Sequence, residues 1–239
     1  MSYALCDENM IFNIITIFPK IFDSYFNESI LKRAQENKIV DIKIHDLRQW
    51  TDDKRRTIDD TPYGGGAGMI MKIEPLYKAL QTLKSKIQSA SWRTKSQNHK
   101  FKIILLSAKG KKWNQALAKK YSKLDRLVFI CGRYEGVDER IINFVDEEIS
   151  IGDYILTGGE IPAMAIIDSI TRLLPGALGN AASPEEESHS VPGILEYPQY
   201  TKPEIFIAEN KKYRVPKILL SGHHQKIKEW RTKKQKKIK

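Results

Sequence analysis

The sequence predicts an α/β protein with a parallel sheet, followed by a smaller basic domain. Apolar, β-branched runs alternate with segments of helical periodicity, a pattern typical of a parallel sheet covered on both faces. After residue 178 a polar linker and then proline-punctuated, lysine-rich sequence replace this alternation. We therefore expect an extension over 1–9, an α/β domain over 10–178, a linker over 179–191 and a small domain over 192–239.

The first half of the chain predicts two strands and two helices. The β-branched and aromatic run Ile11–Phe18 predicts a strand that Pro19 ends, and the alternating Ile39–His45 predicts a second strand. Apolar residues at helical spacing predict single helices over Ile21–Gln35 and Glu74–Ile87. Residues 47–70, ending in DDTPYGGGAG, and the polar residues 89–100 are expected to be loops.

Three more strand–helix pairs follow. The predicted strands are Lys102–Leu106, Leu127–Cys131 and Glu147–Ile151, and the predicted helices are Asn114–Tyr121, Val137–Phe144 and Glu160–Leu173. A glycine-containing turn follows each strand: LSAKG (106–110), CGRYEGVDER (131–140) and SIGDYILTGGEIP (150–162). Ligands of open α/β sheets bind outside the carboxyl ends of strands, so these turns predict one pocket made largely of backbone. The alternative for any single turn is ordinary turn chemistry.

Charge is segregated along the chain. The net charge is +11, and Lys211–Lys239 holds 12 of the 40 Lys and Arg residues with a single acid, Glu229. Clustered cations favour a polyanionic partner such as nucleic acid, and interleaved His223, His224 and Trp230 offer rings for stacking on bases. The alternative is a solvated tail that raises solubility.

Several classes of protein and site are excluded. No apolar run reaches the roughly 20 residues of a membrane span, and the start of the chain lacks a secretory signal. Two cysteines, Cys6 and Cys131, fit a reducing compartment, so we expect a cytoplasmic protein. The first strand is followed by FPKIF, without the glycines of a Rossmann turn. P-loop, G-x-S-x-G and zinc-ligand spacings are also absent, and we expect no metal site.

Five motifs occur in the order found in one known family: DDTPYGGGAGMIMK, CGRYEGVDER, SIGDYILTGGEIPAM, IDSITRLLPGALGN and YTKPE. From Met10 to about Arg231 the chain closely resembles the bacterial tRNA (guanine-N1)-methyltransferases, the TrmD family of the SPOUT class. The resemblance implies an α/β domain with a C-terminal trefoil knot, a small, mainly helical C-terminal domain, and a homodimer with sites between subunits. It also implies S-adenosylmethionine as cofactor, a candidate Mg²⁺ requirement, and the guanosine 3′ to the anticodon of tRNA as substrate.

The resemblance also implies site residues. Those for the cofactor are Leu106, Ser107, Gly132, Glu135, Ile151, Gly152, Asp153, Tyr154, Ile155, Leu156, Gly158, Gly159 and Pro162. Arg172 matches the family's functional arginine, although it could instead pair with the acidic segment at a helix end. Glu187 stands where the family commonly has a catalytic aspartate; Glu185 and Glu186 are neighbouring alternatives, and the stretch could be a solvated acidic loop.

The expected tRNA contacts are Asp59, Asp60, Tyr63, Lys54, Arg55, Arg56, His223, His224, Trp230 and Arg231. Each set has a structural alternative: a tight glycine loop, a solvated charged face, and packing of the small domain, respectively. Two other functions remain open at this point. One is a SPOUT enzyme that modifies another RNA, and the other is an RNA-binding module without catalysis.

Overall fold

The computed structural model describes residues 9–91, 100–179 and 187–238. The chain divides into two compact units, 1–181 and 182–239. Most of the predicted extension 1–9 lies outside the described residues, as does most of the predicted 89–100 loop. Among the described residues, no helix has the length and apolar character to cross a membrane.

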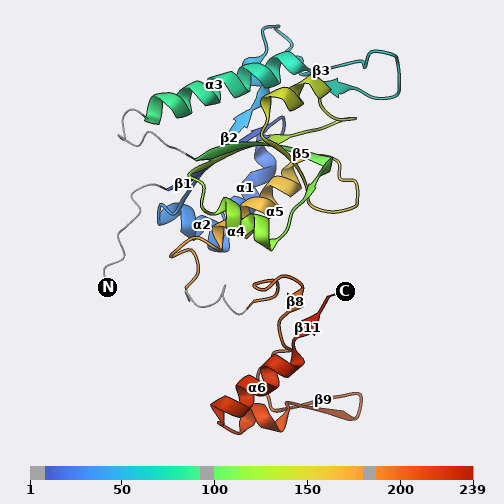
Figure 1. The fold of residues 1–239 in the computed structure, drawn as a ribbon. Helices are drawn as coiled ribbons and strands as arrows, with labels where there is room; N and C mark the ends of the chain where they lie inside the picture. The colour runs from blue at the N-terminus through green and yellow to red at the C-terminus, as the bar shows by residue number, and fades with distance from the viewer. Residues whose placement is uncertain (1–8, 92–99, 180–186, 239) are drawn as a thin grey trace. The chain divides into compact units, whose positions relative to one another are not determined.

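The first unit is organised around a five-stranded sheet in the order β2-β1-β6-β5-β7 (Figure 1). All four pairings are parallel, as the strand–helix alternation predicted. The strands are β1 (Met10–Thr16), β2 (Val40–Asp46), β5 (Phe101–Lys112), β6 (Arg126–Cys131) and β7 (Glu147–Ser150). The carboxyl ends of β1, β6, β5 and β7 therefore lie along one edge of the sheet.

Helices cover both faces of this sheet (Figure 1). The long helix α3 (Ile73–Ser91) packs on one face through a core that includes Leu76, Leu80, Leu83, Ile103, Leu105, Val128 and Ile130. On the other face α4 (Gln115–Tyr121) and α5 (Glu160–Thr171) share a core with Phe12, Ile104, Leu117, Phe129, Ile166, Ile167 and Ile170. Consecutive residues of β5 and β6 alternate between the two cores, which is the period-two pattern of a strand buried on both faces.

The prediction of one helix over Ile21–Gln35 was wrong. The segment forms a 3₁₀ turn η1 (Pro19–Phe22) and two short helices, α1 (Asp23–Phe26) and α2 (Ser29–Glu36). Ser29, the first residue of α2, adopts a left-handed φ of 49°, so one continuous α-helix cannot run through this position. The helical periodicity persisted across this break because Phe22, Phe26, Leu31 and Ala34 all enter the same core.

Two other predicted elements differ in type or length. Val137–Phe144 was expected to be an α-helix, but the structure has a 3₁₀ helix, η3 (Glu139–Phe144). The predicted strand Lys102–Leu106 continues to Lys112, and its register against β7 shifts between Leu106 and Lys111. The expected loop 47–70 contains η2 (Leu47–Trp50) and a short antiparallel pair, β3 (Asp59–Asp60) with β4 (Ile70–Met71).

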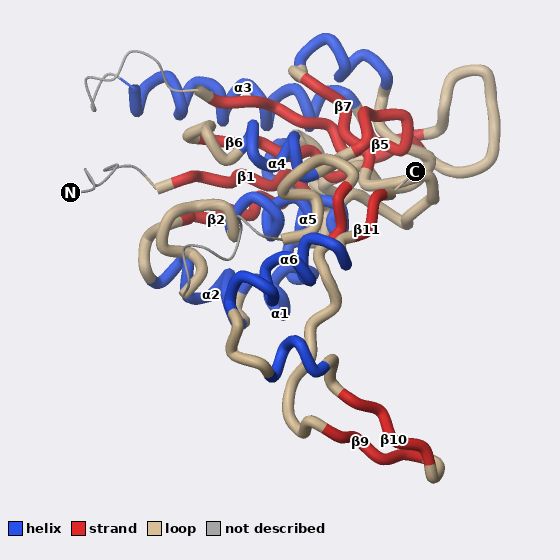
Figure 2. The backbone as a smooth tube through the Cα atoms, turned by 60° about the horizontal axis from the view of Figure 1, so that its bottom comes forward, coloured by secondary structure: helices blue, strands red, loops and turns tan. Residues whose placement is uncertain are grey.

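The second unit combines strands with helix. A hairpin pairs β9 (Ile205–Ala208) with β10 (Lys211–Arg214), and β8 (Ile194–Leu195) pairs with β11 (Lys236–Lys237) (Figure 2). Between them lie η5 (Lys217–Leu220) and α6 (His224–Lys234). The sequence predicted the basic helical end of this unit but not its two strand pairs.

Candidate functional site

A pocket of about 380 Å³ opens at the carboxyl edge of the sheet. Three segments line it: 105–109 of β5, the loop 132–139 after β6, and 148–162 from β7 to α5. These are the three glycine-containing turns that the sequence predicted to form one pocket. Their convergence follows from the strand order, since β6, β5 and β7 are neighbours and run in the same direction.

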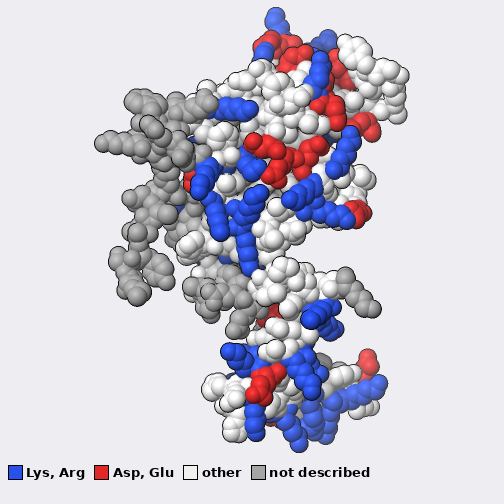
Figure 3. Space-filling view, viewed as in Figure 1, with Lys and Arg blue, Asp and Glu red and all other residues white. Residues whose placement is uncertain are grey.

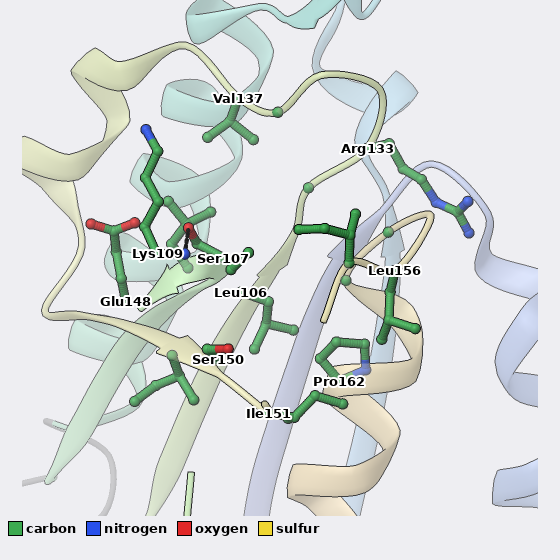
Figure 4. Close-up of a pocket in the computed structure, with 18 of the residues that line it drawn as sticks. Leu106, Ser107, Lys109, Arg133, Val137, Glu148, Ser150, Ile151, Leu156 and Pro162 are labelled. Atoms are coloured by element: carbon green, nitrogen blue, oxygen red, sulfur yellow. Dashed lines mark hydrogen bonds between the residues drawn. The ribbon is translucent and has the colours of Figure 1, made fainter. Parts of the chain in front are cut away.

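The pocket brings together twelve of the thirteen residues expected to hold the cofactor. They are Leu106, Ser107, Gly132, Glu135, Ile151, Gly152, Tyr154, Ile155, Leu156, Gly158, Gly159 and Pro162. Figure 4 shows Leu106 on β5, Leu156 in the loop before α5 and Pro162 in the first turn of α5, all three lining the pocket. The exception is Asp153, whose carboxylate forms an ion pair with Lys112 and which is not a lining residue.

Backbone hydrogen bonds join the pocket loops to one another and to the loop before α3. Gly159 N donates to Gly132 O at 3.0 Å, which ties the turn before α5 to the end of β6. Glu135 N donates to Met69 O at 3.1 Å, and Met71 N donates to Gly136 O at 3.0 Å. The glycine-rich loop after β3 and the pocket wall are therefore one connected backbone structure.

The pocket wall combines apolar side chains with several acidic ones. Glu135, Glu139 and Glu148 line it together with two basic residues: Lys109, whose Nζ lies 3.5 Å from Glu139, and Arg133, which is paired with Glu160. The remaining surface includes aliphatic side chains such as Leu106, Ile149 and Leu156. Such a wall suits a ligand with an apolar ring system and positive charge.

A buried carboxylate beside the pocket was not predicted from the sequence. Glu160, at the start of α5, is 1% exposed and bonds to Thr16 and Arg133. Burial, together with the nearby Glu160 charge, raises the pKa of the Cys131 thiol well above its usual value. The charged residue directly after a Gly-Gly pair was the only sequence signal for this cluster.

The loop expected to face the substrate is exposed at its tip. Tyr63 is fully exposed and Asp60 is exposed, whereas Asp59 is half-buried in β3. All four glycines of the loop adopt positive φ: Gly64, Gly65, Gly66 and Gly68. The backbone conformation therefore favours glycine at these positions, whether or not the loop contacts the substrate. The side chains of Lys54, Arg55 and Arg56 are exposed before this loop.

The two expected catalytic residues belong to different units. Arg172 follows the last turn of α5 and is half-buried, and its backbone N donates to Asp168 O at 3.2 Å. Glu187 is half-buried in the second unit, where its carbonyl accepts from Ser190 N at 3.0 Å. The alternatives Glu185 and Glu186 lie outside the described residues.

In the second unit, Trp230 and Arg231 contact aromatic side chains of their own unit. The Trp230 ring lies 6.4 Å from that of Tyr200, and the Arg231 guanidinium lies 4.8 Å from the ring of Tyr197. Packing within the second unit is thus one reason for Trp230 and Arg231. His223 and His224 are exposed at the start of α6. Over the described parts of the chain, no group of three or more His, Cys, Asp or Glu side chains is arranged to hold a metal ion.

Comparison with known proteins identifies the family. The family model described as tRNA (guanine-1)-methyltransferase TrmD matches residues 10–239. A tRNA (guanine-N(1)-)-methyltransferase of Dictyoglomus turgidum is 51% identical over 221 residues, covering 92% of this chain and 83% of that protein. Proteins of the same name from Acholeplasma laidlawii (51% identical, 94% and 85% covered) and Geobacillus kaustophilus (50% identical, 92% and 84% covered) are similarly close. The chain belongs to the tRNA (guanine-1)-methyltransferase family.

Proposed function

We propose that the protein transfers the methyl group of S-adenosylmethionine to ring nitrogen N1 of the guanosine 3′ to the anticodon in tRNA. The observation that carries this proposal is the single pocket lined by all three glycine-containing turns, in a chain of this family. The relatives that are about half identical to this chain are named for methylation of the same ring nitrogen of guanine in tRNA.

The pocket fits S-adenosylmethionine in size and chemistry. A volume of about 380 Å³ lies within the usual range for cofactor sites. The cofactor carries a sulfonium and an ammonium group, and the carboxylates of Glu135, Glu139 and Glu148 offer it negative charge. We propose that the twelve expected residues that line the pocket hold the cofactor, which supplies an electrophilic methyl group when bound.

Proton removal is the task left to the protein's own side chains. N1 of a neutral guanine carries a proton, so a carboxylate must accept it while negative charge builds on the neighbouring carbonyl oxygen. We assign the carboxylate to Glu187 and the stabilising guanidinium to Arg172. Because the family commonly has aspartate at the position of Glu187, the longer side chain requires its backbone to sit further from the base.

The test is methyl transfer from labelled S-adenosylmethionine to a tRNA transcript with guanosine 3′ to the anticodon. We expect transfer, its loss when adenosine replaces that guanosine, and a fall of roughly 100-fold or more in kcat for Glu187→Gln. Glu185→Gln and Glu186→Gln are the matched controls and are expected to retain activity. Absence of transfer by the unaltered protein would refute the proposal. Transfer to a different nucleotide would instead identify a methyltransferase with another RNA target.

A basic surface supports tRNA as the partner. Lys and Arg side chains cover much of the second unit in Figure 3, in keeping with the 12 basic residues of Lys211–Lys239. Phosphate contacts make RNA binding steeply dependent on salt. An RNA-binding module without catalysis would show this salt dependence too. It would not bind S-adenosylmethionine, so calorimetric binding of the cofactor separates the two functions.

We further propose the remaining features of the family for this chain: a SPOUT-type trefoil knot in the first unit, a cytoplasmic location, and a homodimer with sites between subunits. If Arg172 and Glu187 of one site come from different subunits, mixing Arg172→Ala with Glu187→Ala protein restores activity. Random pairing gives about one quarter of the unaltered activity, because half of the dimers carry one intact site. No restoration is expected if both residues act within one subunit.

A further inference from the structure

The buried carboxylate of Glu160, at the start of α5, bonds to the end of β1 and to the pocket loop that follows β6. Its Oε1 accepts a hydrogen bond of 2.8 Å from Thr16 Oγ1, at the end of β1, and Thr16 Oγ1 itself accepts from Phe18 N at 2.9 Å. Its Oε2 accepts from Arg133 Nε at 2.9 Å. A buried carboxylate is costly unless it is paired and hydrogen-bonded, so these partners determine where the first turn of α5 lies.

Arg133 extends this contact to the loop that precedes α5. Its Nη1 donates to Thr157 O at 3.1 Å, and its guanidinium lies 4.7 Å from the centre of the Phe18 ring. The side chain is 17% exposed. One planar guanidinium thus bonds simultaneously to the helix start and to a backbone carbonyl of the pocket wall, a geometry that a lysine ammonium does not reproduce.

We propose that Arg133 and Glu160 are positioning residues that hold the loops 132–136 and 156–159 in the arrangement that binds the cofactor. Arg133 is itself among the residues that line the pocket, but in Figure 4 the guanidinium end of its side chain points away from the pocket, so we assign it the placing of the neighbouring backbone. Thr157, Gly158 and Gly132, the residues adjoining these contacts, all line the pocket. This inference rests on the proposed function, because it concerns the affinity of the same pocket.

Gly158 is explained by this ion pair. A Cβ at Gly158 would lie 2.2 Å from Arg133 Nε and 2.6 Å from Glu160 Oε2, so a side chain there would displace one of the two. The family resemblance assigned Gly158 to the cofactor. The structure shows a more direct reason for a glycine at this position, because the side chains of Arg133 and Glu160 fill the space that a methyl group would occupy.

Calorimetric titration of S-adenosylmethionine into the protein without tRNA tests the inference. We expect Arg133→Lys and Glu160→Gln each to raise the Kd for the cofactor by at least about tenfold, because a small displacement of pocket backbone is costly to binding. Thr16→Val, which removes a partner of Glu160 outside the pocket, should raise Kd as well. In steady-state assays KM for the cofactor should rise while KM for tRNA stays unchanged.

Lys102→Met is the matched control for a general loss of stability. Lys102 forms a half-buried ion pair with Glu147 at 2.5 Å in the same sheet, and Lys102 is not among the residues that line the pocket. We expect this variant to lower the melting temperature without changing the Kd for the cofactor.

Three results would overturn the inference. The first is an unchanged Kd in both Arg133→Lys and Glu160→Gln. The second is an equal rise in Kd for Lys102→Met, which would show that destabilisation alone weakens binding. The third is an effect of Arg133→Lys alone, which would indicate direct contact of Arg133 with the cofactor. Failure of the unaltered protein to bind S-adenosylmethionine is distinguishable from all three, because it removes the proposed function and this inference together.

Discussion

Replacing Gly159 with alanine should disrupt both the fold and the pocket. A Cβ at this position would lie 2.6 Å from Cys131 Cα, about 0.8 Å closer than an ordinary contact of 3.4 Å, and 3.1 Å from Gly132 N. Both neighbours are backbone atoms at the end of a buried strand, so they cannot rotate away. The turn before α5 must move instead, which breaks the 3.0 Å hydrogen bond from Gly159 N to Gly132 O.

The expected cost follows from these two effects. Overpacking of a filled interior costs about 1–3 kcal/mol, and loss of a buried backbone hydrogen bond adds about 1 kcal/mol. We therefore expect Gly159→Ala to lower the free energy of unfolding by about 2–4 kcal/mol. The same displacement of pocket backbone should raise the Kd for S-adenosylmethionine at least about tenfold.

Urea denaturation and calorimetric titration measure the two quantities, and the chain offers two graded controls. A Cβ at Gly179 would meet no atom within 4 Å, so Gly179→Ala should change stability by less than about 0.5 kcal/mol. A Cβ at Gly152 would meet the Tyr154 ring, which is 54% exposed and free to rotate outward, so Gly152→Ala should be intermediate. If Gly159→Ala is as stable as Gly179→Ala, the steric argument is wrong.

Three further predictions concern stability and RNA binding. Desolvation by burial, then the charges of Lys86 and Lys43, lower the pKa of His45. Its neutral form therefore contributes stability above the unfolded pKa of about 6.5, and this contribution is lost as the pH falls. In urea titrations between about pH 7.5 and 5, His45→Gln should lose less stability than the unaltered protein. Tyr121→Phe removes the hydrogen bond to Glu147 and should lower the free energy of unfolding by about 1–2 kcal/mol in urea denaturation. An unchanged free energy of unfolding would show that the ion pair with Lys102 is enough to stabilise the Glu147 carboxylate. If Arg55 contacts a phosphate, Arg55→Ala should reduce the salt slope of tRNA binding by about 0.7–0.9, whereas an unchanged slope identifies a solvated side chain.

Elements buried on a face of the sheet were predictable from the sequence, because burial determines their periodicity. The strands β1, β2, β6 and β7 and the helix α3 lie within one to four residues of their expected bounds. The end of β5 was not predictable in this way. Residues 107–112 are polar and basic, yet Lys111 and Lys112 pair with Ile149 and Ser150 after the register shift. Backbone pairing at an exposed edge leaves no apolar alternation in the sequence.

The pocket was predictable as a location, since three turns after adjacent parallel strands must meet. Its individual contacts were not. Asp153 stands within the correct turn, but its carboxylate pairs with Lys112, a residue whose position depends on the unpredicted extension of β5. Arg133 and Glu160 are 27 positions apart, and only the strand order brings them together. Charge pairs between loops depend on tertiary structure and leave no local pattern.

The glycines of the pocket turns were predicted in the correct place, but the reason for some of them differs from the predicted one. The sequence predicts a pocket made largely of backbone at the three turns, where glycines permit close approach of a ligand. The structure divides them. A Cβ at Gly158 or Gly159 would strike Arg133 or Cys131, so these two are required by packing of the protein on itself. A Cβ at Gly132 would make only ordinary contacts, and one at Gly136 would meet nothing within 4 Å. Close approach of a ligand therefore remains an explanation for Gly132, whereas Gly136 adopts a φ of 129°, a backbone conformation that by itself favours glycine.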